Sequence, residues 1–330
     1  MKTLVTGGGG FLGQYIVEQL LEAGHQVRVF SRGSYPELEK RGAELFSGNI
    51  RNSSHVDEAC KNIDCVFHTA AKVSMFGNYH DYFQTNVLGT QHVIHGCQKN
   101  NIHKLIFTSS SSVAYHGTDQ LNANESTPYP KTYLSAYSET KALSEKLIRH
   151  ANGQKELLTV SLRPHLIWGP RDKYIIPRLL EQGKKGKLWI VGTGKNLTDI
   201  TYVENIAKAH LLAAEHLIPK SPICGKVYYI TQGKPVLMWE WINEVLGHMN
   251  IPPVTKHISF KTAYTAGALL ETLYRWLHIP GEPPITRMIA QQLSTSHTYD
   301  ISAAQKDFGY TPWISTEEGL KRLFSYLHEQ

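Results

Sequence analysis

The sequence predicts an α/β fold built on a doubly wound parallel sheet, with a smaller, mostly C-terminal substrate-binding region. Two observations point to this fold. Short β-rich runs alternate with helical patterns through the first half of the chain, and this alternation is typical of βαβ units in a parallel sheet. A glycine-rich loop lies between the first run and the first helix, where such folds bind a dinucleotide.

The predicted elements follow one another in a regular order. Residues 1–6 form a short β-rich run, and Phe11 to Ala23 carries apolar residues at helical spacing. Gly24 then ends the helix, as glycine commonly does. The remaining strands are predicted at residues 27–30, 64–67, 105–108 and 158–163.

Beyond residue 163 the rhythm gives way to segments interrupted by Pro and Gly. Such a change usually marks loops that bind a ligand. We therefore expect a dinucleotide-binding domain over residues 1–164 and a mainly substrate-binding region over residues 165–330. Segments near 188–231 are expected to return to the first domain.

The glycine loop has the spacing G-x-x-G-x-x-G at Gly7, Gly10 and Gly13. Glycine permits a tight turn and a close approach of the backbone, so that a pyrophosphate rests on the N-terminus of the next helix. Phe11 and Leu12, the first helical residues, belong to the same expected site. A flexible glycine turn is the alternative, but the flanking strand and helix are those that the motif requires. The loop therefore predicts a Rossmann-type fold that binds a dinucleotide.

The end of the second strand indicates which dinucleotide is bound. An acidic residue there binds the ribose hydroxyls of NAD, whereas a basic residue accommodates the phosphate of NADP. The chain has Ser31 and Arg32 at this point and no acid. A hydroxyl and a guanidinium suit a 2′-phosphate, although Arg32 as an ordinary exposed arginine is the alternative. NADP(H) is favoured, and NAD(H) remains possible.

Tyr137 and Lys141 stand four residues apart in a helical segment. Residues at this spacing share one face of a helix. A phenol titrates near pH 10, and a nearby positive charge is expected to lower that pKa. The pair therefore predicts a tyrosine that acts as a general acid or base. No other tyrosine of the chain has a lysine four residues later.

Composition limits the classes of function. The net charge of +6 is too diffuse to indicate nucleic acid. Four scattered cysteines without CxxC spacing suggest free thiols and a reducing cytosol. The histidines show no HxxxH or HExxH spacing, so no metal is expected. No apolar run is long enough to span a bilayer, and a strand by residue 3 leaves no signal peptide. We expect a soluble cytoplasmic protein.

Several motifs resemble those of the extended short-chain dehydrogenase/reductases. They are the glycine loop, residues 64–71, 86–90 and 107–113, the Tyr137/Lys141 pair, and residues 162–165. The resemblance implies that Ser110 binds the substrate carbonyl oxygen beside Tyr137, and that Lys141 also binds the nicotinamide ribose. It implies a supporting role for Asn86. The cofactor-binding residues that it adds are Asn49, Ile50, Ala70, Ala71, Lys72, Pro164 and His165. His165 as a catalytic base is the alternative to contact with the nicotinamide.

A closer resemblance extends over nearly the whole chain. Residues 72–77, 164–170, 199–203, 281–284 and 295–300 are similar to reductases of bacterial long-chain olefin biosynthesis, a group like the 3β-hydroxysteroid dehydrogenases. It implies NADPH-dependent reduction of 2-alkyl-3-oxoalkanoates to 3-hydroxy acids, and a homodimer. Sterol-type dehydrogenases, nucleotide-sugar epimerases or reductases, and a non-catalytic NADP-sensing regulator are the alternatives.

An apolar keto acid or sterol-like substrate requires an apolar cavity and a cation for the carboxylate. The expected apolar residues are Val73, Met75, Phe76, Trp168 and the stretch 264–277. That stretch is read as a lid, a peripheral membrane contact or an ordinary core helix. Arg171, Lys173 and Arg287 are candidates for the carboxylate, and a surface position is the alternative for each.

Overall fold

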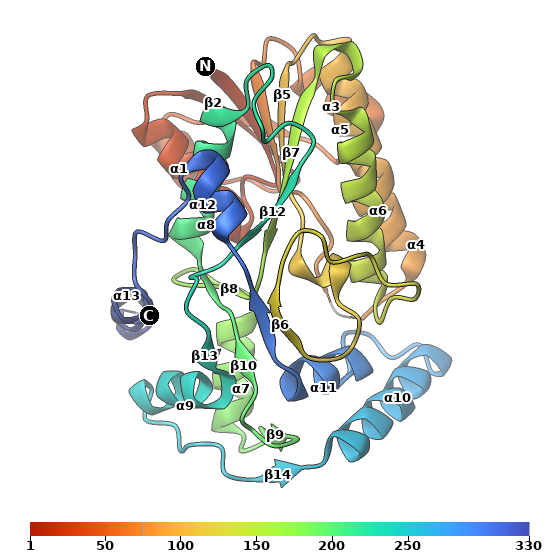
Figure 1. Ribbon diagram of the computed structural model, residues 1–330, viewed down its shortest axis with the longest axis vertical. Helices are drawn as coiled ribbons and strands as arrows, with labels where there is room; N and C mark the ends of the chain where they lie inside the picture. Colours follow the sequence, from red (N-terminus) through yellow and green to blue (C-terminus); the bar gives the residue numbers. More distant parts are fainter. Residues whose placement is uncertain (75, 330) are drawn as a thin grey trace.

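A parallel sheet of seven strands forms the centre of the molecule (Figure 1) in a computed structural model that describes residues 1–74 and 76–329. The strand order is β12-β7-β5-β4-β1-β2-β3. The bounds are β1 Lys2–Thr6, β2 Gln26–Ser31, β3 Glu44–Ser47, β4 Cys65–His68, β5 Lys104–Thr108, β7 Leu158–Pro164 and β12 Val227–Ile230. All five strands predicted from the sequence are present, and the predicted α/β fold is confirmed.

Helices cover both faces of this sheet. On one face lie α1 (Phe11–Glu22), α8 (Val203–His216) and α12 (Ser302–Phe308), and on the other lie α3 (Ser53–Ala59), α5 (Gly89–Lys99) and α6 (Ala136–Ala151) (Figure 1). Each layer buries its own apolar cluster against the sheet. A cluster on each face is what a doubly wound sheet requires. Short elements complete this half, namely α2 Pro36–Lys40, α4 Tyr79–Tyr82, a π-helix Phe83–Leu88 and 3₁₀ turns at Ser111–Ala114 and Gln154–Glu156.

A second region lies beyond the carboxyl ends of the strands, around a separate apolar cluster. Its four-stranded sheet has the order β13-β10-β15-β6. The strands are β6 Gln120–Ala123, β10 Leu197–Thr198, β13 Val236–Leu237 and β15 His297–Tyr299, with two-residue pairs β8 Ile167–Trp168 with β11 Thr201–Tyr202 and β9 Ile190–Val191 with β14 His257–Ile258. The helices are α7 Ile175–Lys184, α9 Met238–His248, α10 Phe260–Trp276, α11 Arg287–Ser294 and α13 Thr316–His328.

The chain crosses between the two regions more often than the sequence predicts. Residues 120–123 fall in the expected first domain, but they pair with β15 of the second region. In the opposite direction, β12 joins the central sheet beside β7 and α8 packs on α1; both lie in the segment near 188–231 that was expected to return to the first domain. The two regions therefore interleave along the sequence.

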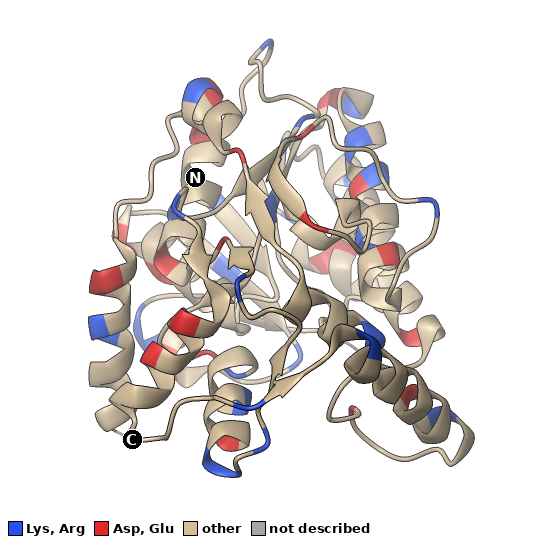
Figure 2. Cartoon of the chain, turned by 60° about the horizontal axis from the view of Figure 1, so that its bottom comes forward, with Lys and Arg blue, Asp and Glu red and all other residues tan. Residues whose placement is uncertain are grey.

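Strand β3 was not predicted from the sequence. It is a four-residue edge strand, and none of its residues is fully buried. The interior strands each contain a run of buried residues, which a half-exposed edge strand lacks. Acidic and basic residues are interspersed along the outer helices (Figure 2), so the net charge of +6 is spread over the surface. Within the described residues, the model contains no helix of the length and apolarity needed to cross a membrane.

A buried ion pair ties α6 to the sheet. Arg163 in β7 donates from Nε and Nη2 to the two carboxylate oxygens of Glu145, at 2.9 and 2.6 Å. Both residues are at most 2% exposed. Tyr129 donates a further hydrogen bond of 2.6 Å to Glu145. Every hydrogen bond here is charge-assisted, which offsets the cost of removing both charges from water.

We expect Arg163→Met to lower the free energy of unfolding by about 3–5 kcal/mol, because it leaves the Glu145 carboxylate buried without its cation. Urea denaturation followed by circular dichroism measures this loss. The double variant Arg163→Met/Glu145→Gln should recover part of the stability, since no buried charge remains. A single variant as stable as the wild type would contradict the prediction.

Candidate active site

The carboxyl ends of the central strands open into a cavity of about 1450 Å³. The glycine loop and the ends of β2, β4, β5 and β7 line one part of it. Residues of α7, α9 and α11 line the other part, and most of these are apolar. In parallel α/β sheets, ligands bind outside the carboxyl ends of the strands. The cavity therefore has space for a cofactor and a substrate side by side.

The glycine loop has the shape that a pyrophosphate needs. Gly7 has φ of +73°, and a Cβ there would lie 2.8 Å from the backbone of Ala70. A Cβ on Gly13 would overlap the Gly7 carbonyl. The first turn of α1 contains no acidic residue, so its N–H groups and helix dipole face the cavity without a competing carboxylate. The residues present fit a dinucleotide.

Most residues expected at the cofactor do line this cavity. They are Gly7, Gly10, Phe11, Leu12, Gly13, Ser31, Arg32, Asn49, Ile50, Ala70, Ala71, Tyr137, Lys141, Pro164 and His165. Lys72 differs, because its Nζ lies 3.7 Å from the Asp81 carboxylate and it is absent from the cavity wall. The Asn49 side chain accepts a hydrogen bond from the Arg51 N–H at 3.0 Å, which fixes the turn after β3.

Tyr35 and Arg51 are residues of this end that sequence reasoning missed. The ring of Tyr35 fills the space that a Cβ of Gly9 would take, so Gly9 is a further required glycine of the loop. Arg51 donates to the Thr85 hydroxyl at 2.9 Å. Both line the cavity. The four-glycine run in the sequence indicates that the loop leaves space for neighbouring groups, but it does not identify Tyr35 as the residue that fills the space beside Gly9.

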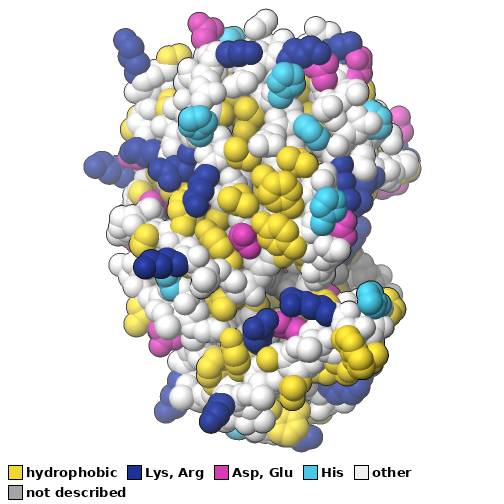
Figure 3. All heavy atoms as spheres, turned by 90° about the vertical axis from the view of Figure 1, so that its right-hand side faces the viewer, with side chains coloured by type: hydrophobic (Ala, Val, Ile, Leu, Met, Phe, Trp, Pro, Cys, Tyr) yellow, Lys and Arg dark blue, Asp and Glu magenta, His cyan; other side chains and the backbone are white. Residues whose placement is uncertain are grey.

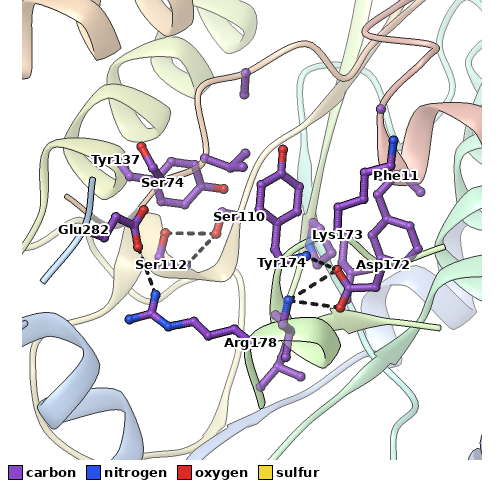
Figure 4. Close-up of a pocket in the computed structure, with 18 of the residues that line it drawn as sticks. Phe11, Ser74, Ser110, Ser112, Tyr137, Asp172, Lys173, Tyr174, Arg178 and Glu282 are labelled. Atoms are coloured by element: carbon purple, nitrogen blue, oxygen red, sulfur yellow. Dashed lines mark hydrogen bonds and ion pairs between the residues drawn. The ribbon is translucent and has the colours of Figure 1, made fainter. Parts of the chain in front are cut away.

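Ser110, Tyr137 and Lys141 come together at the centre of the cavity wall. Ser110 follows β5 and begins the 3₁₀ turn, where its hydroxyl lies 2.9 Å from that of Ser112. Tyr137 lies in the first turn of α6, which begins at the capping residue Ser135. The Ser110 hydroxyl acts to lower the pKa of the Tyr137 phenol. Figure 4 shows Tyr137, Ser110 and Ser112 from two different elements around the same space.

Lys141 is buried one turn after Tyr137. Its Nζ donates to the carbonyl oxygen of Thr108 at 2.5 Å and lies 4.0 Å from the centre of the Phe107 ring. Burial lowers the pKa of Lys141 to about 7, although the charge of Glu145 raises it in part. Near neutral pH this side chain therefore exists in both its charged and its neutral form.

The Tyr137 phenol differs from the sequence prediction. Its pKa is raised by burial, and the hydrogen bond from Ser110 opposes that rise only in part. The expected lowering by Lys141 is therefore wrong for this structure, because desolvation dominates. The phenol stays protonated at neutral pH, which is the state of a proton donor.

His165 lies in the cavity wall with both ring nitrogens engaged. Nδ1 lies 2.7 Å from the Ser111 hydroxyl and Nε2 lies 3.3 Å from that of Thr198. Its ring stacks on that of His297 at 5.4 Å. Burial holds the pKa of His165 well below its usual value, so the ring is neutral. These contacts favour a wall residue over a catalytic base.

Asn86 supports the wall from the π-helix. It accepts from the Lys72 N–H at 2.8 Å and donates to the Thr140 hydroxyl at 3.0 Å. Its own carbonyl accepts from the hydroxyls of Thr90 and Ser144. Asn86 thereby joins the segment after β4 to α6, in the supporting position that the family resemblance implies.

The substrate end of the cavity departs most from the sequence predictions. Trp168 is fully buried in the core of the second region and does not line the cavity, because it packs on Tyr202 and Trp241. Phe76 packs instead on Tyr274 of α10. Val73 does line the cavity, and Met75 lies outside the described residues.

Two of the three predicted carboxylate ligands are committed elsewhere. Arg171 donates twice to Glu18, with both distances 2.7 Å. Arg287 pairs with Glu271 at 2.7 Å. Lys173 lines the cavity. Sequence reasoning missed Arg178, which lines the cavity from α7 and pairs with Glu282 at 2.9 Å.

Helix α10 lies behind the cavity wall. Its Gly267 packs closely on the backbone of Thr286 and Arg287, and none of its described residues lines the cavity. The opposite side of the helix exposes Leu269, Leu273, Trp276 and Leu277; Figure 3 shows apolar side chains in the lower part of that face of the molecule. Ala263 and Tyr264 of α10 pack with the apolar core of the second region, as expected for an ordinary amphipathic helix packed on the core, and the readings as a lid and as a peripheral membrane contact stay predictions. Among the described residues, no three His, Cys, Asp or Glu side chains gather into a metal site.

Comparison with known proteins is consistent with this site. The model of the 3-beta hydroxysteroid dehydrogenase/isomerase family matches residues 4–261. A 2-alkyl-3-oxoalkanoate reductase of Stenotrophomonas maltophilia is 46% identical and covers 98% of each chain. A decarboxylating sterol-4-alpha-carboxylate 3-dehydrogenase of Mus musculus is 36% identical over 99% of this chain and 91% of that protein. The structure of MoeE5 in complex with UDP-glucose and NAD covers 100% of this chain and 99% of its own, with 25% identity and a TM-score of 0.76.

The low pKa of Lys141 leads to a prediction about stability and pH. Between pH 7 and about 10.4 the unfolded lysine binds more protons than the folded one, so the contribution of Lys141 to the free energy of unfolding rises with pH in this window. Lys141→Met lacks this dependence. We expect its stability relative to the wild type to fall by about 2–4 kcal/mol from pH 7 to pH 10.

Urea denaturation of the cofactor-free protein at several pH values measures this difference. Lys184→Met, which removes an exposed lysine of α7, is the control and should show no such trend. A pH-independent difference between Lys141→Met and the wild type would contradict the low pKa.

Proposed function

The chain belongs to the 3-beta hydroxysteroid dehydrogenase/isomerase family, and from this premise we propose that it reduces the 3-oxo group of a long-chain 2-alkyl-3-oxoalkanoate to the 3-hydroxy acid with NADPH. As a member of this family it is an NAD(P)-dependent oxidoreductase that acts on CH–OH and C=O groups. The observation that carries the proposal is the single cavity in which Ser110 and Tyr137 lie between the glycine loop and an apolar wall.

The nicotinamide, when bound, supplies the hydride to C3 of the substrate. Gly7, Gly10 and Gly13 would hold the pyrophosphate, and Pro164 and His165 would border the nicotinamide. The Ser110 hydroxyl orients the ketone oxygen toward Tyr137. The Tyr137 phenol then donates its proton to the oxygen as negative charge develops there. Lys141, in its charged form, stabilises the phenolate that remains.

The protonation states favour the direction of reduction. A reductase needs a protonated donor before the reaction, and burial raises the pKa of Tyr137. The apolar residues of α9 and α11 suit the alkyl chains, because a pocket for such a ligand is mostly apolar with a few placed polar groups. Oxidation of a sterol-type alcohol is the second candidate, since the mouse relative is named for that reaction.

These two relatives share a chemical feature in their names. In a 2-alkyl-3-oxoalkanoate, the carboxylate is attached to C2, next to the oxygen-bearing C3. In a sterol 4-carboxylate it is attached to C4, again next to the reacting C3. Both candidate substrates are therefore acids whose carboxylate lies one carbon from the reaction. NADPH absorbance decay with 3-oxo acids, 3-oxosteroids and UDP-sugars discriminates between the candidates, and no turnover with any of them would favour a regulator.

We expect Tyr137→Phe to lower kcat by about 10²–10⁴-fold with a 2-alkyl-3-oxoalkanoate, because the proton donor is lost. NADPH affinity, measured by fluorescence titration, should change less than about twofold, since the ring remains. Tyr326→Phe, on α13 and outside the cavity, is the control. Normal turnover by Tyr137→Phe would refute the mechanism.

The proposed preference for NADPH rests on Ser31 and Arg32, which line the cavity at the end of β2. We expect Arg32→Ala to raise KM for NADPH about tenfold or more and to leave KM for NADH nearly unchanged, because only NADPH carries the 2′-phosphate. Steady-state kinetics with both cofactors measure the two effects. Lys195→Ala, an exposed lysine outside the cavity, controls for net charge. Equal effects on both cofactors would contradict the assignment.

A further inference from the structure

The substrate end of the cavity contains few groups that suit a carboxylate. The described cations of the cavity wall are Arg32, Arg51, Lys141, Lys173, Arg178 and Lys187. Arg32 and Arg51 lie at the cofactor end, and Lys141 is bound to the β5 carbonyl. The N-terminus of α7 is closed to anions, because the buried Asp172 accepts from the N–H groups of residues 174–176.

Arg178 differs from the two remaining lysines in how it is held. Lys173 and Lys187 are exposed, whereas Arg178 is half-buried. Its Nη1 donates to the Glu282 carboxylate at 2.9 Å, and its Nη2 donates to the carbonyl oxygens of Pro283 and Pro284 at 3.3 and 3.2 Å. Figure 4 shows the guanidinium and Glu282 facing each other, in the same view as Ser110 and Tyr137.

The surroundings of the Arg178 guanidinium favour the binding of a carboxylate. Leu179, Trp241, Ile242, Ile285, Met288 and Ile289 are among the apolar residues that line the same cavity. A carboxylate that enters such a wall loses water and requires a cation with good geometry. Arginine offers a planar pair of donors that matches a carboxylate. The contact with Glu282 demonstrates that a carboxylate fits at this position.

We propose that Arg178 binds the carboxylate of the substrate and that Glu282 holds the same position until the substrate displaces it. The inference rests on the proposed function and adds the specificity for acids. The contacts of Nη2 with Pro283 and Pro284 keep the guanidinium in place during the exchange. Glu282 is partly exposed and follows Gly281, which has φ of +90° and open space around it, so its carboxylate has a path to water. One charge-assisted pair replaces another.

The exchange makes opposite predictions for the two residues. Removing the charge of Arg178 weakens binding of an acid, whereas removing the charge of Glu282 strengthens it, because the internal competitor is lost. A methyl ester of the same substrate has no carboxylate, so neither change should affect it. The ratio of KM for acid and ester isolates the carboxylate from the alkyl chains.

The experiment uses oxidation of a long-chain 2-alkyl-3-hydroxyalkanoate and its methyl ester with NADP⁺, because the hydroxy acid does not lose CO₂ as a 3-oxo acid does. We expect Arg178→Gln to raise KM for the acid about 10–100-fold and KM for the ester less than about twofold. Arg178→Lys should give an intermediate value. Glu282→Gln should lower KM for the acid severalfold without changing that of the ester. Lys184→Gln, an exposed lysine on the same helix, is the control.

Thermal denaturation of each variant separates binding from folding. Equal increases in KM for acid and ester, together with a lower Tm for both Arg178→Gln and Glu282→Gln, would overturn the proposal and leave Arg178 as a structural tie for residues 282–284. Wild-type oxidation of both compounds with no dependence on Arg178 overturns this inference alone. Wild-type inactivity toward both compounds overturns the proposed function and the inference with it.

Discussion

Glu145 and Arg163 meet in the interior, where neither charge is stable without the other. Their pairing fixes the position of α6 relative to β7, because the planar guanidinium donates two hydrogen bonds to a carboxylate only in a narrow range of orientations. Side-chain packing alone would fix this position less strictly. Lys141 lies on α6 one turn before Glu145, and Tyr137 lies one turn before Lys141. The position of the Tyr137 phenol therefore depends on an ion pair two turns away. The same carboxylate also raises the pKa of Lys141 against the effect of burial.

Burial favours the neutral form of both Tyr137 and Lys141, although one is an acid and the other a base. It raises the pKa of the phenol and lowers the pKa of the ammonium. The site thus contains a phenol, Tyr137, that stays protonated at neutral pH, and a lysine, Lys141, with a pKa of about 7. In such a site, charge comes mainly from the bound ligands and from the reaction itself. Fixed hydrogen-bond donors stabilise that charge strongly because the surroundings exclude water.

The sequence predicted those parts of the site whose residues lie close together along the chain. The glycine loop and the Tyr137/Lys141 spacing each lie within one turn or one helix, and the five interior strands are short β-rich runs. Contacts between distant segments were not predictable in this way. Arg171 was expected in the site, but its partner Glu18 lies 153 residues earlier. Arg178 was missed because Glu282 lies 104 residues later. The pKa of Tyr137 was predicted with the wrong sign, since the spacing reveals the neighbouring charge but not the degree of burial.

The two parts of the cavity come from different lengths of chain. The hydroxyls of Ser110 and Tyr137 lie on one continuous segment from β5 to the first turns of α6, whereas the apolar wall combines α7, α9 and α11 from a separate core. The wall and the helix segment after Tyr137 belong to separate apolar clusters. This division allows residues of the wall to change while the segment that carries Ser110 and Tyr137 stays the same. Two relatives that are 46% and 36% identical to this chain over nearly its full length are named for a keto acid and for a sterol, which such a division of the chain allows.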